Sequence, residues 1–401
     1  MTNSVKSGQR PVHVAGVGML PFSKPGASES YEVMGARAAR AALDDARVDY
    51  QWVEQVYAGY VYGDSCSGQA VSYRLGLSGV PVFNVNNNCA TGSTALFLGR
   101  QAVASGAAEC VLVVGFEQMG RGAIAAQWSD RPNPSQRLLD VLDEVQGTDP
   151  QAPIAAQLFG GAGRMHMQLY GTRADTFARI AVKARAHAAR NPNALFRDPL
   201  TLDEVMASPM VFDPLTRLQC CPPTCGGAAA VLCSAAFARR HGLDTRVRIA
   251  AQAMATDGNS SFDERDLRKL VGYDMARRAA REVYEASGVS PEDIPVVELH
   301  DCFTANELIT YEALGLCREG EAERFVLEGQ NTFGGRVVTN PSGGLLSKGH
   351  PLGATGLAQC AELVWQLRGQ AGERQVDGAR LALQHNLGLG GACVVTLYER
   401  D

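Results

Sequence analysis

The residue best placed for chemistry in this sequence is Cys89. It follows a mostly apolar segment, 82–85, and three consecutive asparagines, 86–88, and it opens a run of small residues with helical spacing. Asparagine suits a tight turn because its side chain bonds the local backbone and tolerates left-handed conformations. A strand, a turn and a thiol at a helix start predict a nucleophile, since the positive end of a helix lowers a thiol pKa. The alternative is a buried structural thiol, as most cysteines are.

Three later stretches carry groups that could work with this thiol. His300 and Cys302 follow an apolar strand, and catalytic groups gather at such strand ends in parallel sheets. His350 stands in a glycine-rich approach to a helix, and residues 386–391 form a glycine-rich turn able to aim N–H groups at an oxyanion. Each signal alone is weak, because a loop histidine is more often a satisfied polar group than a base. His385, next to the turn, either takes part or only bonds a neighbouring loop.

Composition places the chain among ordinary globular proteins. Its 401 residues are 46% apolar and 20% charged, and 43 of them are glycines, which predicts many tight turns. A net charge of -5 gives no reason to expect nucleic acid as a partner. The eleven cysteines lack the spacing of a disulfide framework, so we expect a reducing compartment.

No stretch reads as a targeting or membrane segment. Residues 1–10 are polar with no signal-peptide core behind them, and the C-terminal Tyr-Glu-Arg-Asp is no peroxisomal address. The uncharged segment 218–238 contains prolines and glycines, which makes it a poor membrane span. We therefore expect a cytoplasmic protein.

The chain repeats itself. The segment 34–40 has the same form as 275–281, and at that offset Val56 matches Val297 in a following strand. Ala-Thr-Gly at 90–92 recurs at 354–356, again at a helix start. Alternating strands and helices predict an α/β fold with a mostly parallel sheet covered by helices on both faces. The repeat predicts two similar halves packed together.

A long insertion separates the halves. We expect an N-terminal half from residues 1–117 plus 213–245, an inserted loop domain at 118–212 and a C-terminal half at 246–401. The insertion has helical patterns at 154–170 and 175–189. An insertion of this size beside the nucleophile half suggests a substrate cover.

The motifs together resemble the thiolase family, specifically the thiolase domain of the sterol-carrier-protein-X-type 3-ketoacyl-CoA thiolases. Cys89 with its asparagines is similar to that family's nucleophile loop, 300–303 (His-Asp-Cys-Phe) to the tetrapeptide of this branch, and 349–351 (Gly-His-Pro) to its base motif. Most other thiolases have Cys-x-Gly where residues 386–388 read Asn-Leu-Gly, and the sterol-carrier branch also lacks that cysteine. Cys225 stands where relatives often carry aspartate.

The resemblance implies a thiolase fold, in which two βαβ halves form a layered αβαβα sandwich, and it implies a mechanism. Cys89 would carry the acyl group as a thioester after His350 removes its proton. His300 would hold the enolate oxygen, Cys302 would act as acid and base in place of the missing cysteine, and the Gly388 N–H would face the acyl oxyanion. Coenzyme A is the co-substrate, with no bound cofactor and no metal. A homodimer without an attached lipid-transfer domain is expected.

Other readings stay open. The same site could run as a biosynthetic Claisen catalyst, and some thiolase-like proteins are lyases or scaffolds that usually lack the nucleophile. The acyl chain and the CoA contacts are not readable, although Arg164 and His166 could meet CoA phosphates or lie on a solvated helix face. We expect packed thiols rather than zinc ligands at three further positions, Cys220, Cys221 and Cys225, because no Cys-x-x-Cys pair is present.

Overall fold

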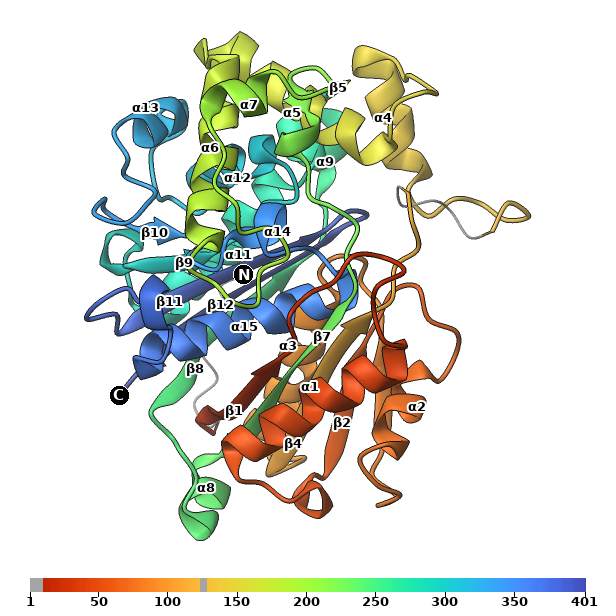
Figure 1. Ribbon diagram of the computed structural model, residues 1–401, viewed down its shortest axis with the longest axis vertical. Coiled ribbons are helices and arrows are strands. Elements are labelled where there is room, and N and C mark those ends of the chain that lie inside the picture. The colour runs from red at the N-terminus through yellow and green to blue at the C-terminus, as the bar shows by residue number, and fades with distance from the viewer. Residues whose placement is uncertain (1–9, 123–127) are drawn as a thin grey trace.

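The computed structural model describes residues 10–122 and 128–401, and a ten-stranded sheet runs through both halves of the chain. The first half supplies β1 (Val12–Met19), β2 (Gln55–Gly59), β3 (Val82–Val85), β4 (Cys110–Glu117) and β7 (Gly226–Ser234). The second half supplies β8 (Val247–Ala255), β9 (Val296–Glu298), β10 (Val338–Thr339), β11 (Leu381–Gly388) and β12 (Ala392–Arg400). Their order is β10-β9-β11-β12-β8-β1-β7-β4-β2-β3 (Figure 1). The halves meet where His13 of β1 pairs with Arg248 of β8.

The sheet, expected to be mostly parallel, is mixed. β2 is parallel to β3 and β4, and β9 is parallel to β10 and β11, but β7 and β12 are antiparallel to both of their neighbours. The prediction was wrong at β12 because only residues 389–391 join it to β11, and so short a connection can only link antiparallel strands. At β7 the strand enters after the insertion and not after the crossover helix of the repeat.

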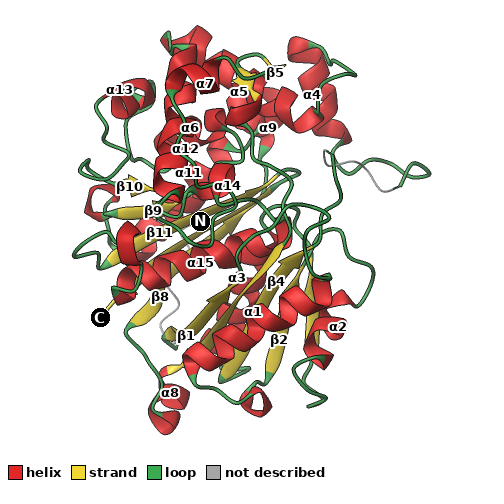
Figure 2. Ribbon diagram, viewed as in Figure 1, coloured by secondary structure: helices red, strands yellow, loops and turns green. Residues whose placement is uncertain are grey.

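Helices cover both groups of strands and also lie between them (Figure 2). α1 (Tyr31–Ala46) packs on β1 and β7, and α11 (Tyr273–Ser287) packs on β8 and β12. α3 (Thr91–Ser105) and α15 (Leu352–Arg368) pack on each other and on strands of both halves. This confirms the layered αβαβα arrangement of two similar halves. No helix among the described residues has the length and apolar character needed to cross a membrane.

The internal repeat seen in the sequence corresponds to equivalent elements. Segments 34–40 and 275–281 lie in α1 and α11, the outer helices of the two halves. Val56 and Val297 lie in β2 and β9, the two strands with parallel neighbours on both sides. The two Ala-Thr-Gly segments lie at the starts of α3 and α15, in the central layer.

The central helices touch at backbone distance because glycines face each other at their first turns. A Cβ added at Gly92 would lie 2.8 Å from the carbonyl oxygen of Gly353, and one at Gly356 would lie 2.3 Å from the nitrogen of Ser93. Real side chains do not tolerate such distances, so only glycine permits this approach. The starts of α3 and α15, one from each half, are therefore held side by side.

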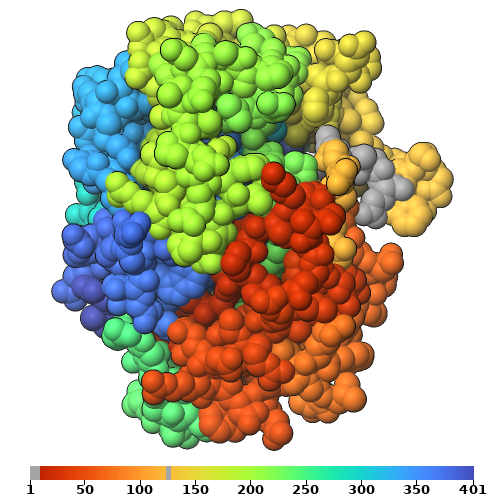
Figure 3. Space-filling model, in the orientation of Figure 1, coloured from red at the N-terminus to blue at the C-terminus, as the bar shows by residue number. Residues whose placement is uncertain are grey.

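The insertion between β4 and β7 packs mainly on the second half. It contains α4 (Gln136–Gln146), α5 (Ile154–Tyr170), α6 (Ala174–Ala188), α7 (Leu202–Met206), β5 (Met210–Phe212) and β6 (Leu215–Thr216). The bounds of α5 and α6 agree with the two predicted helical patterns to within one residue. α5 and α6 both pack on α12 (Thr304–Ala313), and Figure 3 shows the insertion in yellow and green over the upper part of one face.

The remaining helices are short. They are α2 (Ser67–Tyr73), α8 (Ala235–His241), α9 (Asn259–Asp263), α10 (Leu267–Leu270), α13 (Ala322–Leu327) and α14 (Gly344–Ser347). Of these, α10 packs on α5 and α14 packs on α6, so the insertion rests on helices of the second half.

Candidate active site

Cys89 lies in the turn between β3 and α3, as the sequence predicts. Asn88 adopts a left-handed conformation with φ of 51°. The Thr91 hydroxyl donates to the carbonyl of Asn88 at 2.6 Å and accepts the N–H of Asn87 at 2.8 Å, so the first helical turn fixes the loop. The Cys89 sulfur lies 3.6 Å from Oδ1 of Asn88, and the Asn88 amide donates to the carbonyl of Leu389 at 3.1 Å.

The thiol is protonated at rest, contrary to the expectation drawn from its position at a helix start. Burial raises the pKa of Cys89 to about 12, and the nearby carboxyl of Glu117 contributes to that rise. The cost of burying a charge outweighs the favourable end of the helix. A base must therefore take the proton before the sulfur can attack a substrate.

His350 presents an unprotonated ring nitrogen to the same cavity. Its Nδ1 lies 2.7 Å from Oγ1 of Thr355, and that hydroxyl donates its only hydrogen to the carbonyl of Pro351 at 3.0 Å. The hydroxyl must then accept from Nδ1–H, because each ring nitrogen of a neutral imidazole either donates or accepts. Burial lowers the pKa of His350 to about 3, so the ring is neutral. Nε2 is buried without a partner among the described residues and can accept a proton.

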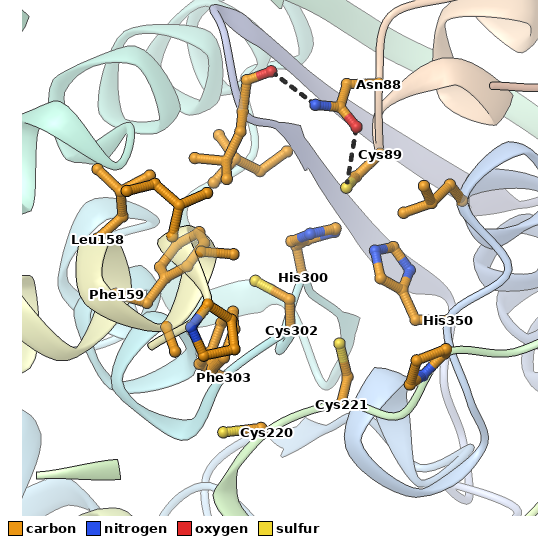
Figure 4. A pocket seen from close by; sticks show the side chains of 18 of the residues that line it. Asn88, Cys89, Leu158, Phe159, Cys220, Cys221, His300, Cys302, Phe303 and His350 are labelled. Atoms are coloured by element: carbon orange, nitrogen blue, oxygen red, sulfur yellow. Dashed lines mark hydrogen bonds between the residues drawn. The ribbon is translucent and has the colours of Figure 1, made fainter. Parts of the chain in front are cut away.

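His300 faces His350 across the cavity. Their ring centroids lie 5.1 Å apart at an interplanar angle of 82°. One ligand-type atom from each of Cys89, His300 and His350 lies within 4.8 Å of the others, and Figure 4 shows the three side chains turned toward one another. The Asn386 amide nitrogen lies 3.1 Å from Nδ1 of His300. Such a set could hold a soft divalent ion only if both rings offered bare nitrogens.

The His-Asp-Cys-Phe segment places three of its four residues in the cavity wall. His300, Cys302 and Phe303 line the cavity, whereas Asp301 points away and accepts the N–H of Leu345 at 2.7 Å, at the start of α14. Phe303 stacks on Phe159 at a centroid distance of 5.0 Å. Burial raises the pKa of the Cys302 thiol well above its usual value.

Gly388 and His385 both belong to β11, so the predicted glycine turn is shorter than expected and spans residues 389–391. A Cβ on Gly388 would lie 2.4 Å from the carbonyl oxygen of Asn87, which places its backbone against the nucleophile loop. His385 is buried behind His300 and accepts the main-chain N–H of that residue at 3.4 Å. It does not line the cavity.

Sequence reasoning missed two residues of the site. Glu117, at the end of β4, is buried and accepts three main-chain hydrogen bonds, from Val61, Tyr62 and Gly353. Burial raises its pKa to about 7, and it ties the start of α15 to the first half. The signal in the sequence that could have identified Glu117 was an acidic residue at the end of an otherwise apolar strand. Cys221 lines the cavity, and its N–H donates to the carbonyl of Cys302 at 2.9 Å.

Other sequence interpretations need correction. His166 is neither a phosphate contact nor on a solvated face: it is fully buried, with Nδ1 2.8 Å from the Thr172 hydroxyl and Nε2 3.0 Å from the Glu312 carboxyl. The prediction of packed thiols holds for Cys225, which is fully buried, but Cys220 joins Cys221 in the cavity wall.

The cavity that these groups share has a volume of about 590 Å³. Beyond the thiols and histidines its wall is largely apolar and comes from α4, α5, β5 and the turn after β11. The apolar lining residues include Leu138, Leu139, Ile154, Leu158, Phe159, Val211 and Leu389. The insertion thus supplies an apolar chamber that opens onto the sulfur of Cys89, a fitting place for a hydrocarbon chain.

Comparison with known proteins gives matches along nearly the whole chain. The family described as "Thiolase, N-terminal domain" matches residues 12–236, and "Thiolase C-terminal domain-like" matches residues 254–398. The chain is 57% identical over 392 residues to sterol carrier protein 2 of Oryctolagus cuniculus, covering 97% of this chain and 72% of that protein. It is 36% identical to the acetyl-CoA acetyltransferase of Methanothermobacter thermautotrophicus, covering 98% and 100%.

Two solved structures with the same fold carry different descriptions, one as an aldolase and one as a thiolase. An Ltp2-ChsH2(DUF35) aldolase gives a TM-score of 0.82 at 27% identity, covering 98% of both chains. Human mitochondrial 3-ketoacyl-CoA thiolase in complex with CoA gives a TM-score of 0.74 at 19% identity, also covering 98% of both chains. The second likeness concerns the fold alone.

Proposed function

Because the chain belongs to the thiolase family, we propose that it is a 3-ketoacyl-CoA thiolase, an acyl-CoA C-acyltransferase that cleaves its substrate with CoA through an acyl-cysteine. One observation carries the proposal: one ligand-type atom from each of Cys89, His300 and His350 lies within 4.8 Å of the others at an apolar chamber, and Nε2 of His350 is bare. We further propose a role in the breakdown of fatty acids or sterol side chains, as the family resemblance implies.

The first half-reaction breaks the bond between C2 and C3. The Cys89 proton moves to Nε2 of His350, and the sulfur attacks the C3 carbonyl carbon. When the C2–C3 bond breaks, its electron pair forms the enolate of acetyl-CoA or of a related acyl-CoA, and the shortened acyl chain stays on Cys89. The enolate oxygen accepts a hydrogen bond from His300. Cys302 gives its proton to C2 and is left as a thiolate.

The second half-reaction returns the site to its starting state. The Cys302 thiolate takes the proton of the CoA thiol, and the CoA sulfur attacks the acyl carbon held on Cys89. The main-chain N–H groups of Cys89 and Gly388 face the oxyanion of the tetrahedral intermediate in this proposal. The sulfur of Cys89 then leaves and regains its proton from His350, so every proton is accounted for.

Two other uses of the site remain as alternatives. The same residues serve a Claisen condensation when the reaction runs in reverse, since direction belongs to the substrates and not to the enzyme. The likeness to a solved aldolase favours a lyase as the second alternative. The buried pair of Cys89 and His350 argues against the lyase, because carbon–carbon cleavage by retro-aldol chemistry has no need of an acyl-carrying thiol.

A cleavage assay tests the proposal. Purified protein is given short, long and 2-methyl-branched 3-ketoacyl-CoAs with and without CoA, and loss of the ketoacyl-CoA is followed. We expect cleavage that depends on CoA for at least one class. Cleavage without CoA would favour the lyase, and no cleavage of any class would overturn the thiolase assignment.

We also propose the three-part division at residues 117, 212 and 245, and a homodimer. The dimer is supported by family resemblance and by β3, an edge strand of the sheet on which Phe83 is exposed. Such an edge offers unpaired main-chain groups to a second copy. Analytical ultracentrifugation at micromolar concentration should give twice the chain mass of 42.7 kDa. A single species at the monomer mass would contradict the dimer.

A further inference from the structure

Asn386 occupies the place in β11 where, by resemblance, most other thiolases carry a catalytic cysteine. It is fully buried, and its amide nitrogen makes two contacts. The nitrogen lies 3.1 Å from the main-chain carbonyl oxygen of Cys89 and 3.1 Å from Nδ1 of His300. A carboxamide nitrogen has two hydrogens, so these two contacts use both of them.

The carbonyl of Cys89 fixes which way the amide faces. A carbonyl oxygen can only accept, so the nitrogen of Asn386, and not its oxygen, must face it. The same nitrogen then donates to Nδ1 of His300, which must hold a lone pair. Burial, with His350 and His385 nearby, keeps the pKa of His300 well below its usual value, so the ring is neutral. Its single proton is therefore on Nε2.

The two cavity histidines are thus neutral tautomers of opposite kind. Thr355 accepts from Nδ1–H of His350 and leaves Nε2 bare, whereas Asn386 donates to Nδ1 of His300 and leaves Nε2 protonated. One ring offers the cavity a proton acceptor and the other a hydrogen-bond donor. The partner behind each ring decides which it is.

We propose that Asn386 is a positioning residue that holds His300 as the Nε2–H tautomer, so that the ring donates to the oxygen of the enolate. The identity of that oxygen rests on the proposed function, whereas the tautomer rests on the contacts alone. Because the same amide also bonds the carbonyl of Cys89, it keeps this donor at a fixed place relative to the nucleophile. Asn386, which stands where other thiolases carry a catalytic thiol, thus orients the hydrogen-bond donor His300.

The first test reads the tautomers directly in the wild-type protein. Nitrogen-15 spectra of histidine-labelled protein distinguish a protonated from a bare ring nitrogen, and comparison with His300→Gln and His350→Gln assigns the two rings. We expect Nε2–H at His300 and Nδ1–H at His350. A His300 ring protonated at Nδ1, or charged, would overturn the proposal whether or not the protein is a thiolase.

The second test replaces the donor by an acceptor of the same shape. In Asn386→Asp the carboxylate accepts from Nδ1–H, so neutral His300 turns a bare Nε2 to the cavity, while the charged ring at lower pH regains the Nε2–H donor. Exchange of the C2 hydrogens of acetyl-CoA in D₂O reports enolate formation. The exchange rate of the variant divided by that of the wild type should decrease as the pH is raised from about 6 to about 9. The expected decrease is ~100-fold, the loss seen when one oxyanion donor is removed.

Two controls separate this from damage to packing. Asn386→Ala removes the same contacts without installing an acceptor. Asn306→Asp places a carboxylate at the residue that bonds the main-chain carbonyl of His300, and it leaves the contact between Asn386 and the His300 ring unchanged. Both should give exchange ratios that do not change with pH. A pH-independent ratio in Asn386→Asp would overturn the role of Asn386. Absence of exchange in wild type would instead contradict the proposed function, and the spectra would still decide the tautomer.

Discussion

Replacement of Cys89 by alanine is expected to abolish thiolysis and to leave no acyl group on the protein. Among the described residues, Cys89 is the thiol that groups with ring nitrogens of both His300 and His350 within 4.8 Å, and Nε2 of His350 is free to accept its proton. Loss of a covalent nucleophile reduces turnover by at least ~10⁴-fold in comparable enzymes. The measurement is a cleavage rate together with the mass of the peptide that contains residue 89 after incubation with an acyl-CoA.

The adduct is the informative part of this experiment. Alkylation rates are a poor substitute, because Cys66 is exposed while burial raises the pKa of Cys89. Cys66→Ala serves as the matched control, and it should keep both the adduct and the turnover. An acyl mass on the peptide that contains Cys302 in the wild-type protein would reverse the roles proposed for the two thiols.

Cys302→Ser should separate the nucleophilic role of Cys89 from the proton transfers that Cys302 makes in both half-reactions. Serine keeps the size and hydrogen bonding of cysteine but holds its proton far too tightly to exchange it with a carbanion or with CoA. The variant should still form the acyl-enzyme from a simple acyl-CoA donor, because Cys89 and His350 are untouched. Thiolytic turnover should fall by at least ~100-fold, the lower range for loss of a general acid–base.

Cys221→Ser is the matched control for that variant. Cys221 lines the same cavity and bonds the main chain of Cys302, yet the mechanism gives its thiol no proton to carry. Turnover close to wild type in Cys302→Ser, with a large loss in Cys221→Ser, would transfer the acid–base role to Cys221. Near-normal rates in both variants would direct attention to His385 behind His300.

The layered fold could be predicted because the repeat encodes it twice. Val56 and Val297, in equivalent strands, mark the same βαβ unit in each half. The sense of β7 and β12 could not be predicted from the repeat. It depends on how a strand enters the sheet, and neither strand arrives through the repeated crossover helix.

The candidate site was predicted only as far as residue types and strand ends allow. Cys89 and His350 lie just before the central helices α3 and α15, and His300 and Cys302 follow the end of β9 and line the same cavity. The protonation state of Cys89 could not be predicted, because its pKa depends on burial among residues far apart in the sequence (Met34, Met119, Cys225 and Leu352) and on the charge of Glu117. Cys221 was missed for a related reason: its place in the wall depends on an isolated pairing of Cys220 with Phe303 that leaves no pattern in the sequence.

The glycine contact between α3 and α15 has a consequence for motion. Cys89 and His350 lie at two helix starts whose backbones are in contact at Gly92 and Gly353. A hinge motion between the halves would break this contact. Proton transfer from Cys89 to His350 therefore requires no closure step, unlike in enzymes that assemble their catalytic groups around the substrate. If a slow conformational phase accompanies turnover, we expect it to respond to substitutions in the walls that α4 and α5 provide.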